Sequence, residues 1–454
     1  MTTVGMKKSV CFLLGFCLAF FSFACFSCSN TEKKQMEKDL RVRLSAQEIH
    51  DWVKSEKSKK EQAVVDFVEN LPMEERIAQL FLVNLEGNKK FRPVEFFADG
   101  KPMIPGGYLF FSYNVADSAD GVKEFTTSIN SFCLGNDIVP PLLGIDQEGG
   151  LVNRLRNVTS PLPSAKLIAE RLPADMAQDF YCAQGAQMQG MGFHLNLAPV
   201  AEPVDENNSG FLGTRSYGDA KAVEQFAAAA IAGYKEGGIF CVLKHFPGNT
   251  NDDPHTGLPE IQLGARRLEE DYLKPFQKLL CGNPAGVLMS HARTSAFDPE
   301  KPACLSEYWV TQKLRNEYGY DGLIFSDDIF MAALEKNGFP PDVAVVMAVK
   351  AGVDVIMLSE KRFGSALQVL EKKAMEDGTF LEKINKSVRR IVKAKIQAGI
   401  LSFDSAEGGC SVVLNVHNAL EPTLDSEGML SGSGFSAAYD KGFALYNEYF
   451  GASR

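Results

Sequence analysis

A loop that follows one short apolar segment holds the residues best suited to acid–base chemistry. The segment Ile239–Leu243 is followed directly by Lys244 and His245, and a polar loop then places Asp253 and His255 two residues apart. Histidine exchanges protons near neutral pH, and a neighbouring carboxylate can orient the imidazole and tune its acidity. In an extended loop, residues two apart point their side chains to the same side. The spacing therefore indicates an Asp–His pair for proton transfer beside a cationic strand end.

Several short apolar segments, including this one, are followed directly or in the next loop by charged residues or histidines. These residues are Asp146, Arg154, Arg215, Lys244, His245, His291, Asp327 and Asp328. In parallel α/β folds, the loops that follow the strands meet at one end of the sheet and carry the chemistry. Carboxylates, cations and imidazoles that converge there would form a site for a polar, hydroxyl-rich ligand.

Each of these residues also has a common structural role. An Asp just before a predicted helix often caps that helix, which could explain Asp327 or Asp328. His255 could be a solvated loop histidine, and Lys244 could pack in the core with its ammonium group reaching water. Asp146 could simply neutralise the arginine eight residues further on. The joint placement of these residues at the same end of successive segments favours the functional interpretation.

Short apolar strands that alternate with longer helical patterns would position these residues. The predicted strands are Gln79–Asn84, Gly107–Ser112, Leu142–Asp146, His194–Val200, Phe240–Leu243, Gly286–Ser290, Leu323–Ser326 and Val353–Leu358. This alternation predicts a parallel sheet with crossover helices, and eight units in roughly 340 residues predict a single α/β barrel of the TIM type, (β/α)8. The alternative is an open doubly wound sheet, but no G-x-G-x-x-G motif follows the first strand.

Composition and charge exclude several classes of protein. The 454 residues are 45% hydrophobic and 23% charged, which is ordinary for a globular protein with a large core. The net charge of −10, without a basic patch beyond the first sixty residues, argues against a nucleic-acid partner. The six cysteines after residue 28 show no C-x-x-C spacing, so zinc is not expected and no disulfide pairing is predicted.

The first 28 residues differ from the rest of the chain. A short basic start precedes the apolar run Val10–Phe26, which is typical of an export signal. Cys28 resembles the lipid-attachment site of bacterial lipoproteins, and Cys25 is the second candidate. A plain cleaved signal and an uncleaved anchor remain open, because the run nearly reaches membrane-spanning length. We therefore expect an exported protein, periplasmic or attached to a membrane through a lipid on Cys28.

Four parts are expected along the chain. A signal at 1–28 and a Lys/Glu-rich tether or helix at 29–60 precede the barrel at 61–401. The remaining residues, 402–454, are rich in Gly and Ser and predict a short irregular tail, apart from a possible helix near Phe443–Phe450.

A series of ordered motifs resembles the family 3 glycoside hydrolases, specifically the bacterial β-N-acetylglucosaminidases. These motifs are D-Q-E-G-G at 146–150, N-L-A-P-V at 196–200, G-x-R-S at 213–216, K-H-F-P-G at 244–248, D-x-H at 253–255, L-P at 258–259, P-A-C-L-S at 302–306, D-G-L-I-F-S-D-D at 321–328 and A-G-V-D at 351–354. The likeness extends over residues 65–400, and it implies both a TIM barrel and a glycosidase.

The resemblance also implies a role for each matched residue. Asp327 would be the nucleophile and His255 the general acid/base, with Asp253 orienting His255. The residues implied to hold the sugar next to the cleaved bond are Asp146, Arg154, Arg215, Lys244 and His245. These types fit the chemistry, because a retaining glycosidase needs a carboxylate that attacks the anomeric carbon and a proton donor for the leaving oxygen.

The sequence departs from the family pattern at several positions. Residues 249–252 read N-T-N-D where the family usually has H-G-D-T, and the loop is two residues shorter. Pro254 replaces the common Ser, Leu151 stands where an Arg usually follows D-Q-E-G-G, and Glu202 stands where an Asp follows A-P-V. The shorter loop bears on the reach of His255 and on the specificity for the leaving group.

The expected function is therefore that of a retaining β-N-acetylglucosaminidase. It would release terminal β-linked N-acetylglucosamine from peptidoglycan fragments or chitin-type oligosaccharides through a covalent intermediate on Asp327. The alternatives are a β-glucosidase or xylosidase of the same family, a glycoside phosphorylase, or a surface lipoprotein that binds sugar without catalysis. The expected partner is an oligosaccharide, and no cofactor or metal is implied. The protein is expected to bind a membrane only through the N-terminal lipid.

Overall fold

The computed structural model describes residues 46–252, 257–405, 409–415 and 432–451 of the 454. The predicted signal with Cys25 and Cys28 lies outside these residues, and so do Asp253 and His255. The chain divides into two compact units, Met1–Gln62 and Ala63–Arg454. Helix α3 (Ala46–Asn70) crosses this boundary and begins within the stretch predicted as tether or helix. In the described part of the chain, no helix combines the length and apolar character needed to cross a membrane.

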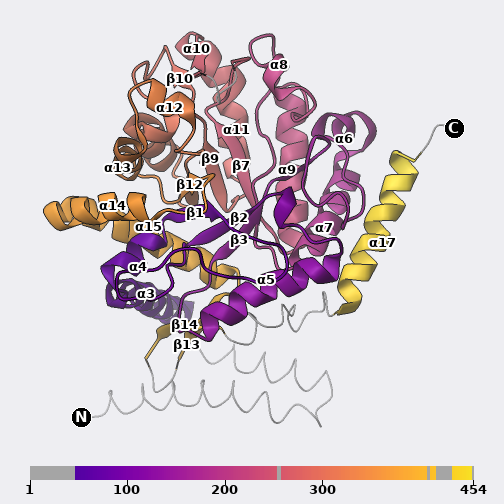
Figure 1. Ribbon diagram of the computed structural model, residues 1–454. Helices are drawn as coiled ribbons and strands as arrows, with labels where there is room; N and C mark the ends of the chain where they lie inside the picture. Colours follow the sequence, from indigo (N-terminus) through magenta and orange to yellow (C-terminus); the bar gives the residue numbers. More distant parts are fainter. Residues whose placement is uncertain (1–45, 253–256, 406–408, 416–431, 452–454) are drawn as a thin grey trace. The chain divides into compact units, whose positions relative to one another are not determined.

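The second unit is built around an eight-stranded parallel sheet (Figure 1). Its strands are β1 (Phe81–Asn84), β2 (Gly107–Phe110), β3 (Leu142–Ile145), β6 (Leu195–Asn196), β7 (Phe240–Phe246), β9 (Gly286–Met289), β11 (Leu323–Phe325) and β12 (Ile356–Leu358). They follow the order β11-β9-β7-β6-β3-β2-β1-β12. A single parallel bridge, Phe325↔Val355, joins the two end strands. The sheet is thus a nearly closed barrel of the TIM type. Each predicted strand overlaps one of its strands, and β7 continues three residues beyond its predicted end at Leu243.

The strands lie in the core of the molecule because nearly all their residues are apolar. Strands β1, β2, β3 and β9 are buried along their whole length, as expected of a parallel sheet covered on its outer face and filled inside. Packing around the barrel is close: a Cβ on Gly286 would lie 2.6 Å from the ring of Phe325. Such close packing gives the residues at the strand ends a rigid base.

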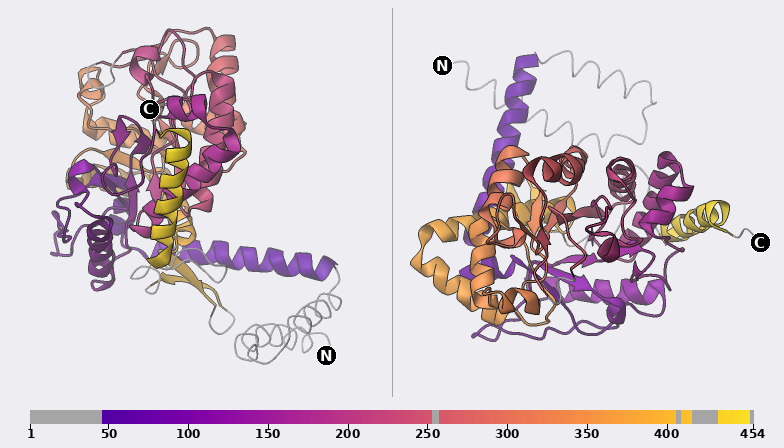
Figure 2. Two further views of the ribbon diagram at one scale, coloured as in Figure 1. Left: turned by 90° about the vertical axis from the view of Figure 1, so that its right-hand side faces the viewer. Right: turned by 90° about the horizontal axis from the view of Figure 1, so that it is seen from above.

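Helices surround the barrel (Figure 2). They are α4 (Met73–Ala78), α5 (Ala119–Leu134), α6 (Ala165–Arg171), α7 (Ala174–Gly190), α8 (Ser209–Leu212), α9 (Ala220–Glu236), α10 (Ala265–Arg267), α11 (Lys274–Leu280), α12 (Ala332–Lys336), α13 (Pro341–Ala351), α14 (Gly364–Glu376) and α15 (Gly378–Gln397), with the 3-10 turns η1 (Ser112–Asn114) and η3 (Ala303–Leu305) and the π-helices η2 (Leu268–Leu273) and η4 (Tyr308–Glu317). Short strand pairs β4 (Gln147–Gly149) with β5 (Val152–Asn153), and β8 (Glu260–Ile261) with β10 (Arg293–Thr294), lie in the loops. Side chains of Ser118, Ser164, Asp219 and Asp377 cap α5, α6, α9 and α15.

The expectation of eight complete strand–helix units is wrong at the first unit. The connection between β1 and β2, residues 85–106, is described throughout and contains no helix. Its sequence explains the difference, because three glycines and three prolines interrupt any helical periodicity there. The helices before β1 and after the later strands cover the barrel instead.

The tail is more regular than the sequence predicted. Strands β13 (Leu401–Asp404) and β14 (Ser411–Leu414) form an antiparallel hairpin, and α17 (Gly432–Tyr449) is a helix that begins well before Phe443. In Figure 1, α17 lies alongside α7, where Lys441 pairs with Asp179 at 2.9 Å. The described tail thus includes a helix packed on the barrel's outer layer.

Candidate active site

Lys244 joins two strands at the carboxyl end of the barrel. Its Nζ lies 2.6 Å from Asp146 Oδ1, just after β3, and 2.7 Å from Glu148 Oε1 in β4. The Lys244 side chain is only 5% exposed. Burial opposes its charge, but the two carboxylates outweigh this and raise the pKa of Lys244 above its ordinary value. Lys244 is therefore a fixed cation and not a snorkelling core residue.

Glu148 is a site residue to which the sequence analysis assigned no role. Arg215 binds it through two hydrogen bonds, Nε to Oε2 and Nη2 to Oε1, both 2.8 Å long. Burial by itself raises the pKa of Glu148, but Lys244 and Arg215 together lower it to about 2. Its place in the D-Q-E-G-G motif was the available signal. Since its partners lie far away in the chain, the motif alone could not reveal its function as the anion between two cations.

Glu202 holds His245 in position. Its Oε1 lies 2.6 Å from His245 Nδ1 and also accepts a hydrogen bond from the His245 backbone N–H at 3.1 Å. Asn249 Nδ2 donates to both oxygens of Glu202, at 3.2 and 3.3 Å. Glu202 and Asn249 are two of the positions that depart from the family pattern, and here they contact each other. The longer Glu side chain therefore anchors both the strand-end imidazole and the start of the following loop.

Asp327 lies just beyond β11 and is partly exposed at the same end of the barrel. Burial favours its neutral form, but His291, His245, the Asp328 N–H and Lys244 together lower the pKa of Asp327 below its ordinary value. The carboxylate is therefore ionised at neutral pH. The neighbouring Asp328 has the structural role of a turn cap, because its Oδ1 accepts hydrogen bonds from the N–H groups of Phe330 and Ser359, both at 3.0 Å.

A buried pair, His291 and Cys304, supports the turn that carries Asp327. His291 Nε2 lies 3.0 Å from the backbone oxygen of Asp328, so this nitrogen must carry a proton and donate it. His291 Nδ1 lies 3.1 Å from Cys304 Sγ, and burial raises the pKa of the Cys304 thiol well above its ordinary value. The thiol therefore stays protonated, and it is the hydrogen-bond partner of His291 Nδ1. His291 was predicted to lie at the end of the barrel, but its sequence context indicated no role for it.

Arg154 does not pair with Asp146, so the alternative that Asp146 only neutralises Arg154 is wrong. Its guanidinium lies over the ring of Phe111, 5.7 Å from the centroid. Its Nε is buried and, among the described residues, has no hydrogen-bond partner. Arg154 therefore has a buried donor that no described residue satisfies.

The structure thus brings most of the predicted residues together. Asp146, Lys244 and Arg215 form one ion-paired network, and His245 and Asp327 lie beside it. Asp253 and His255 lie outside the described residues, so their roles stay predictions. In the part of the chain that the structure describes, no group of three or more His, Cys, Asp or Glu side chains could hold a metal ion.

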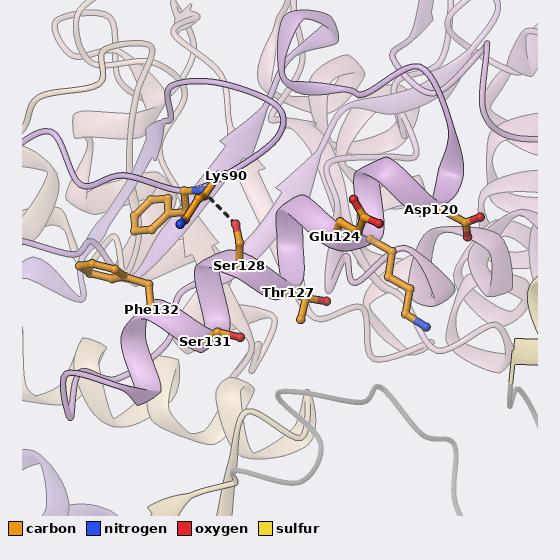
Figure 3. A pocket seen from close by; sticks show the side chains of 9 residues that line it. Lys90, Asp120, Glu124, Thr127, Ser128, Ser131 and Phe132 are labelled. Atoms are coloured by element: carbon orange, nitrogen blue, oxygen red, sulfur yellow. Dashed lines mark hydrogen bonds between the residues drawn. The ribbon is translucent and has the colours of Figure 1, made fainter.

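A separate surface hollow lies on the outer side of the barrel and not at the strand ends (Figure 3). It is lined by residues of α5 and of the connection between β1 and β2: Lys90, Phe91, Asp120, Lys123, Glu124, Thr127, Ser128, Ser131 and Phe132. Ser128 accepts a hydrogen bond from the Phe91 backbone N–H at 2.9 Å. None of the predicted site residues reaches it.

A barrel whose carboxyl end gathers an ionised carboxylate, fixed cations and an oriented imidazole defines an enzyme of the TIM-barrel class with a site for a polar, hydroxyl-rich ligand. The chain belongs to glycosyl hydrolase family 3: the model of the glycosyl hydrolase family 3 N-terminal domain matches residues 73–394. It is therefore a glycoside hydrolase that acts on O-glycosyl bonds.

Relatives with curated names agree with this family. The chain is 33% identical over 263 residues to a β-hexosaminidase of Alkalilimnicola ehrlichii, covering 56% of this chain and 73% of the relative. It is 30% identical over 284 residues to the β-hexosaminidase LpqI of Mycobacterium tuberculosis, covering 60% of this chain and 72% of LpqI.

Solved structures show the same barrel. A family 3 β-N-acetylglucosaminidase from Paenibacillus sp. FPU-7 matches with a TM-score of 0.68 and 27% identity, over 84% of this chain and 69% of that one. A fungal multi-domain family 3 β-N-acetylglucosaminidase matches with a TM-score of 0.70 and 25% identity, over 84% of this chain. This chain spans only 43% of the length of that fungal protein.

Proposed function

We propose that this protein is a retaining β-N-acetylglucosaminidase that releases terminal β-linked N-acetylglucosamine from peptidoglycan fragments or chitin-type oligosaccharides. The observation that carries the proposal is the ionised Asp327 carboxylate at the end of β11, beside His245 and the network around Lys244. The names of the curated relatives support the choice of sugar. The D-x-H motif favours this activity over that of a β-glucosidase or xylosidase.

In the proposed mechanism, Asp327 attacks the anomeric carbon and forms a covalent glycosyl ester. His255 protonates the leaving oxygen, and then removes a proton from the water that hydrolyses the ester, so the configuration is retained. Asp253 orients His255. Lys244, Arg154 and Arg215 donate hydrogen bonds to sugar hydroxyls, and Lys244 also helps to keep Asp327 ionised.

Replacement of the nucleophile tests this mechanism directly. We expect Asp327→Ala to lower kcat on a chromogenic β-N-acetylglucosaminide by more than about 1000-fold, because attack on the anomeric carbon is lost. Azide should restore part of the rate and give the α-glycosyl azide, since it attacks from the face that the carboxylate occupied. Asp321→Asn, at an exposed carboxylate that precedes β11, is the control and should keep full activity. Unchanged turnover by Asp327→Ala would remove Asp327 from the mechanism.

The proposed acid/base role of His255 has a different signature. We expect His255→Ala to lower kcat about 100-fold or more on a substrate with a poor leaving group, because that group must be protonated as it leaves. A dinitrophenyl glycoside needs no proton, so the covalent intermediate should still form rapidly and accumulate as a burst. An equal loss of glycosylation rate on both substrates would contradict the assignment. The same assays in phosphate buffer identify a phosphorylase if a sugar 1-phosphate is the product.

We further propose that the protein is exported and attached to a membrane through a lipid on Cys28. The basic start and the apolar run of residues 10–26 support this. Labelled fatty acid should be incorporated into the full chain expressed in a bacterial host, and Cys28→Ala should abolish the label. Incorporation that persists in Cys28→Ala and disappears in Cys25→Ala would move the site to Cys25.

A further inference from the structure

Phe111 borders the site network at the level of Asp146. Strands β2 and β3 are paired in parallel with Phe110 opposite Ile145, and Phe111 and Asp146 are the next residues along each strand. Neighbouring strands lie about 4.8 Å apart, and residues in register point to the same face of a sheet. Since Asp146 is bound to Lys244, Phe111 lies beside the place where the terminal sugar is proposed to bind.

An aromatic stack extends outward from this position. The rings of Phe111 and Tyr113 are stacked, with centroids 5.9 Å apart and an interplanar angle of 9°. Arg154 lies over the Phe111 ring, so a cation and two rings follow one another. Tyr113 is 53% exposed, which is unusual for a large side chain in a barrel that buries most of its aromatics. A flat, exposed ring next to a sugar site offers an apolar face to a pyranose.

The loop that carries the stack is held firmly. Asn114 is fully buried, and its Oδ1 accepts a hydrogen bond from the Phe111 backbone N–H at 3.0 Å. Its Nδ2 donates to the backbone oxygens of Leu85, at 3.0 Å, and Gly87, at 2.9 Å. These bonds tie the loop after β2 to the loop after β1, so little ordering is needed when a ligand binds.

Polar groups lie beside the outer ring. Lys361 pairs with Glu86 at 2.9 Å, and both act electrostatically on the Tyr113 phenol. Burial, the largest effect, raises the pKa of Tyr113, so the phenol stays neutral at physiological pH. An apolar ring face edged by exposed donors and acceptors matches a sugar ring, which presents C–H groups on its face and hydroxyls at its rim.

We propose that Phe111 and Tyr113 form a stacking platform for the second sugar ring of the substrate, the ring that leaves when the glycosidic bond is cleaved. The proposal rests on the proposed function, because it places this ring relative to the sugar held by Asp146, Lys244 and Arg154. It makes Tyr113 a residue that sets preference for an oligosaccharide over a small leaving group.

Two substrates with the same terminal sugar test the platform. One is the β-linked disaccharide of N-acetylglucosamine, and the other is the glycosyl fluoride, whose leaving group is too small to reach Tyr113. We expect Tyr113→Ala to lower kcat/KM on the disaccharide about tenfold, which is what the apolar area covered by one ring face contributes. The fluoride should be hydrolysed at an unchanged rate. Tyr113→Phe keeps the ring, and its kcat/KM on both substrates should stay within about twofold of the wild-type value.

A matched control removes an exposed aromatic elsewhere. Phe443 on α17 is 42% exposed and is stacked on Tyr439, and Phe443→Ala should affect neither substrate. Equal loss by Tyr113→Ala on both substrates would overturn the proposal, because the effect would then act on the terminal sugar or on the loop. An unchanged kcat/KM of Tyr113→Ala on the disaccharide would overturn the proposal as well.

Binding separates the platform from the proposed activity. If the wild-type protein cleaves neither substrate, the proposed function fails, and calorimetry on Asp327→Asn still tests the stack. The disaccharide should bind about tenfold more tightly than the monosaccharide, and adding Tyr113→Ala should remove that difference. Equal affinities for the two sugars before Tyr113 is changed would overturn the proposal.

Discussion

Hydrogen bonding distinguishes the carboxylates at the end of the barrel from one another. Asp146, Glu148 and Glu202 each bind a cation or an imidazole. Asp327, by contrast, accepts a hydrogen bond from the Asp328 N–H at 2.8 Å and, among the described residues, binds no cation directly. A carboxylate already paired with a cation is a weak nucleophile, whereas one kept ionised by charges nearby remains free to attack. The arrangement therefore separates residues that position the ligand from the one proposed to react.

The pair His291–Cys304 leads to a prediction about kcat. We expect Cys304→Ala to lower kcat about tenfold with little change in KM, because His291 Nδ1 loses its hydrogen-bond partner and the Asp327–Asp328 turn loosens. Cys304→Ser keeps a hydrogen-bonding side chain, and its kcat should stay within about threefold of the wild-type value. Steady-state kinetics on a chromogenic glycoside measures both values.

A general loss of packing would have a different outcome. If Cys304→Ala and Cys304→Ser lose kcat equally, the thiol does not act through its hydrogen bond, and Cys304 is not a positioning residue. Urea unfolding of both variants shows whether stability has changed in parallel.

At the scale of elements, Asp354 ties the outer helices to the barrel. It is fully buried, and it binds Arg315 of η4 and, at 3.1 Å, Arg390 of α15. Its Oδ2 also accepts a hydrogen bond from the backbone N–H of Ile324 in β11, at 2.9 Å. Three elements are thus joined through one carboxylate just before β12.

We predict that Asp354→Asn lowers the free energy of unfolding by about 3–5 kcal/mol, because two partly buried arginines lose the fully buried charge that compensates them. Asp321→Asn is a matched control, since Asp321 pairs with the same Arg390 at 3.3 Å but its side chain is 87% exposed. Asp321→Asn should lower the free energy of unfolding by less than about 1 kcal/mol. Urea unfolding measures both, and similar losses in the two variants would show that burial is not the cause.

At the scale of the whole molecule, one lysine helps to close the opposite, amino-terminal end of the barrel. Lys395 is fully buried and donates to Gln79 Oε1 at 2.6 Å and to the Pro140 backbone oxygen at 2.7 Å, just before β1 and β3. Burial lowers its pKa to about 7. The nearby His194 is partly buried, and loss of hydration lowers its pKa to about 4. This end of the barrel therefore holds titratable groups in their less charged forms.

The titration of Lys395 predicts that stability rises with pH. The unfolded chain binds a proton at this residue up to about pH 10.4, whereas the folded protein releases it near pH 7, so raising the pH favours the folded state in between. From pH 7 to pH 9 the free energy of unfolding should increase by about 2–3 kcal/mol relative to Lys395→Met. Lys372→Met, at an exposed lysine of α14, is the control and should track the wild type. Parallel curves for wild type and Lys395→Met would contradict the prediction.

Local sequence patterns determined the strands and the ordered motifs of this protein. Apolar runs bounded by turn residues predict buried strands because burial and backbone preference act over a few residues. Each of the eight strands was found where such a run lies. The absence of a helix between β1 and β2 is also determined by local sequence, namely by the glycines and prolines of residues 85–106.

Only the tertiary structure decided which charged groups meet. Asp146 pairs with Lys244, 98 residues away, and not with Arg154 eight residues on; Glu148 lies between Lys244 and Arg215; and Cys304 contacts His291. The docking of α17 on α7 was likewise set by distant contacts. The physical reason is that closing the barrel brings the ends of separate strands within hydrogen-bond reach. A pairing of this kind depends on the register and tilt of all eight strands, which no short stretch of sequence contains.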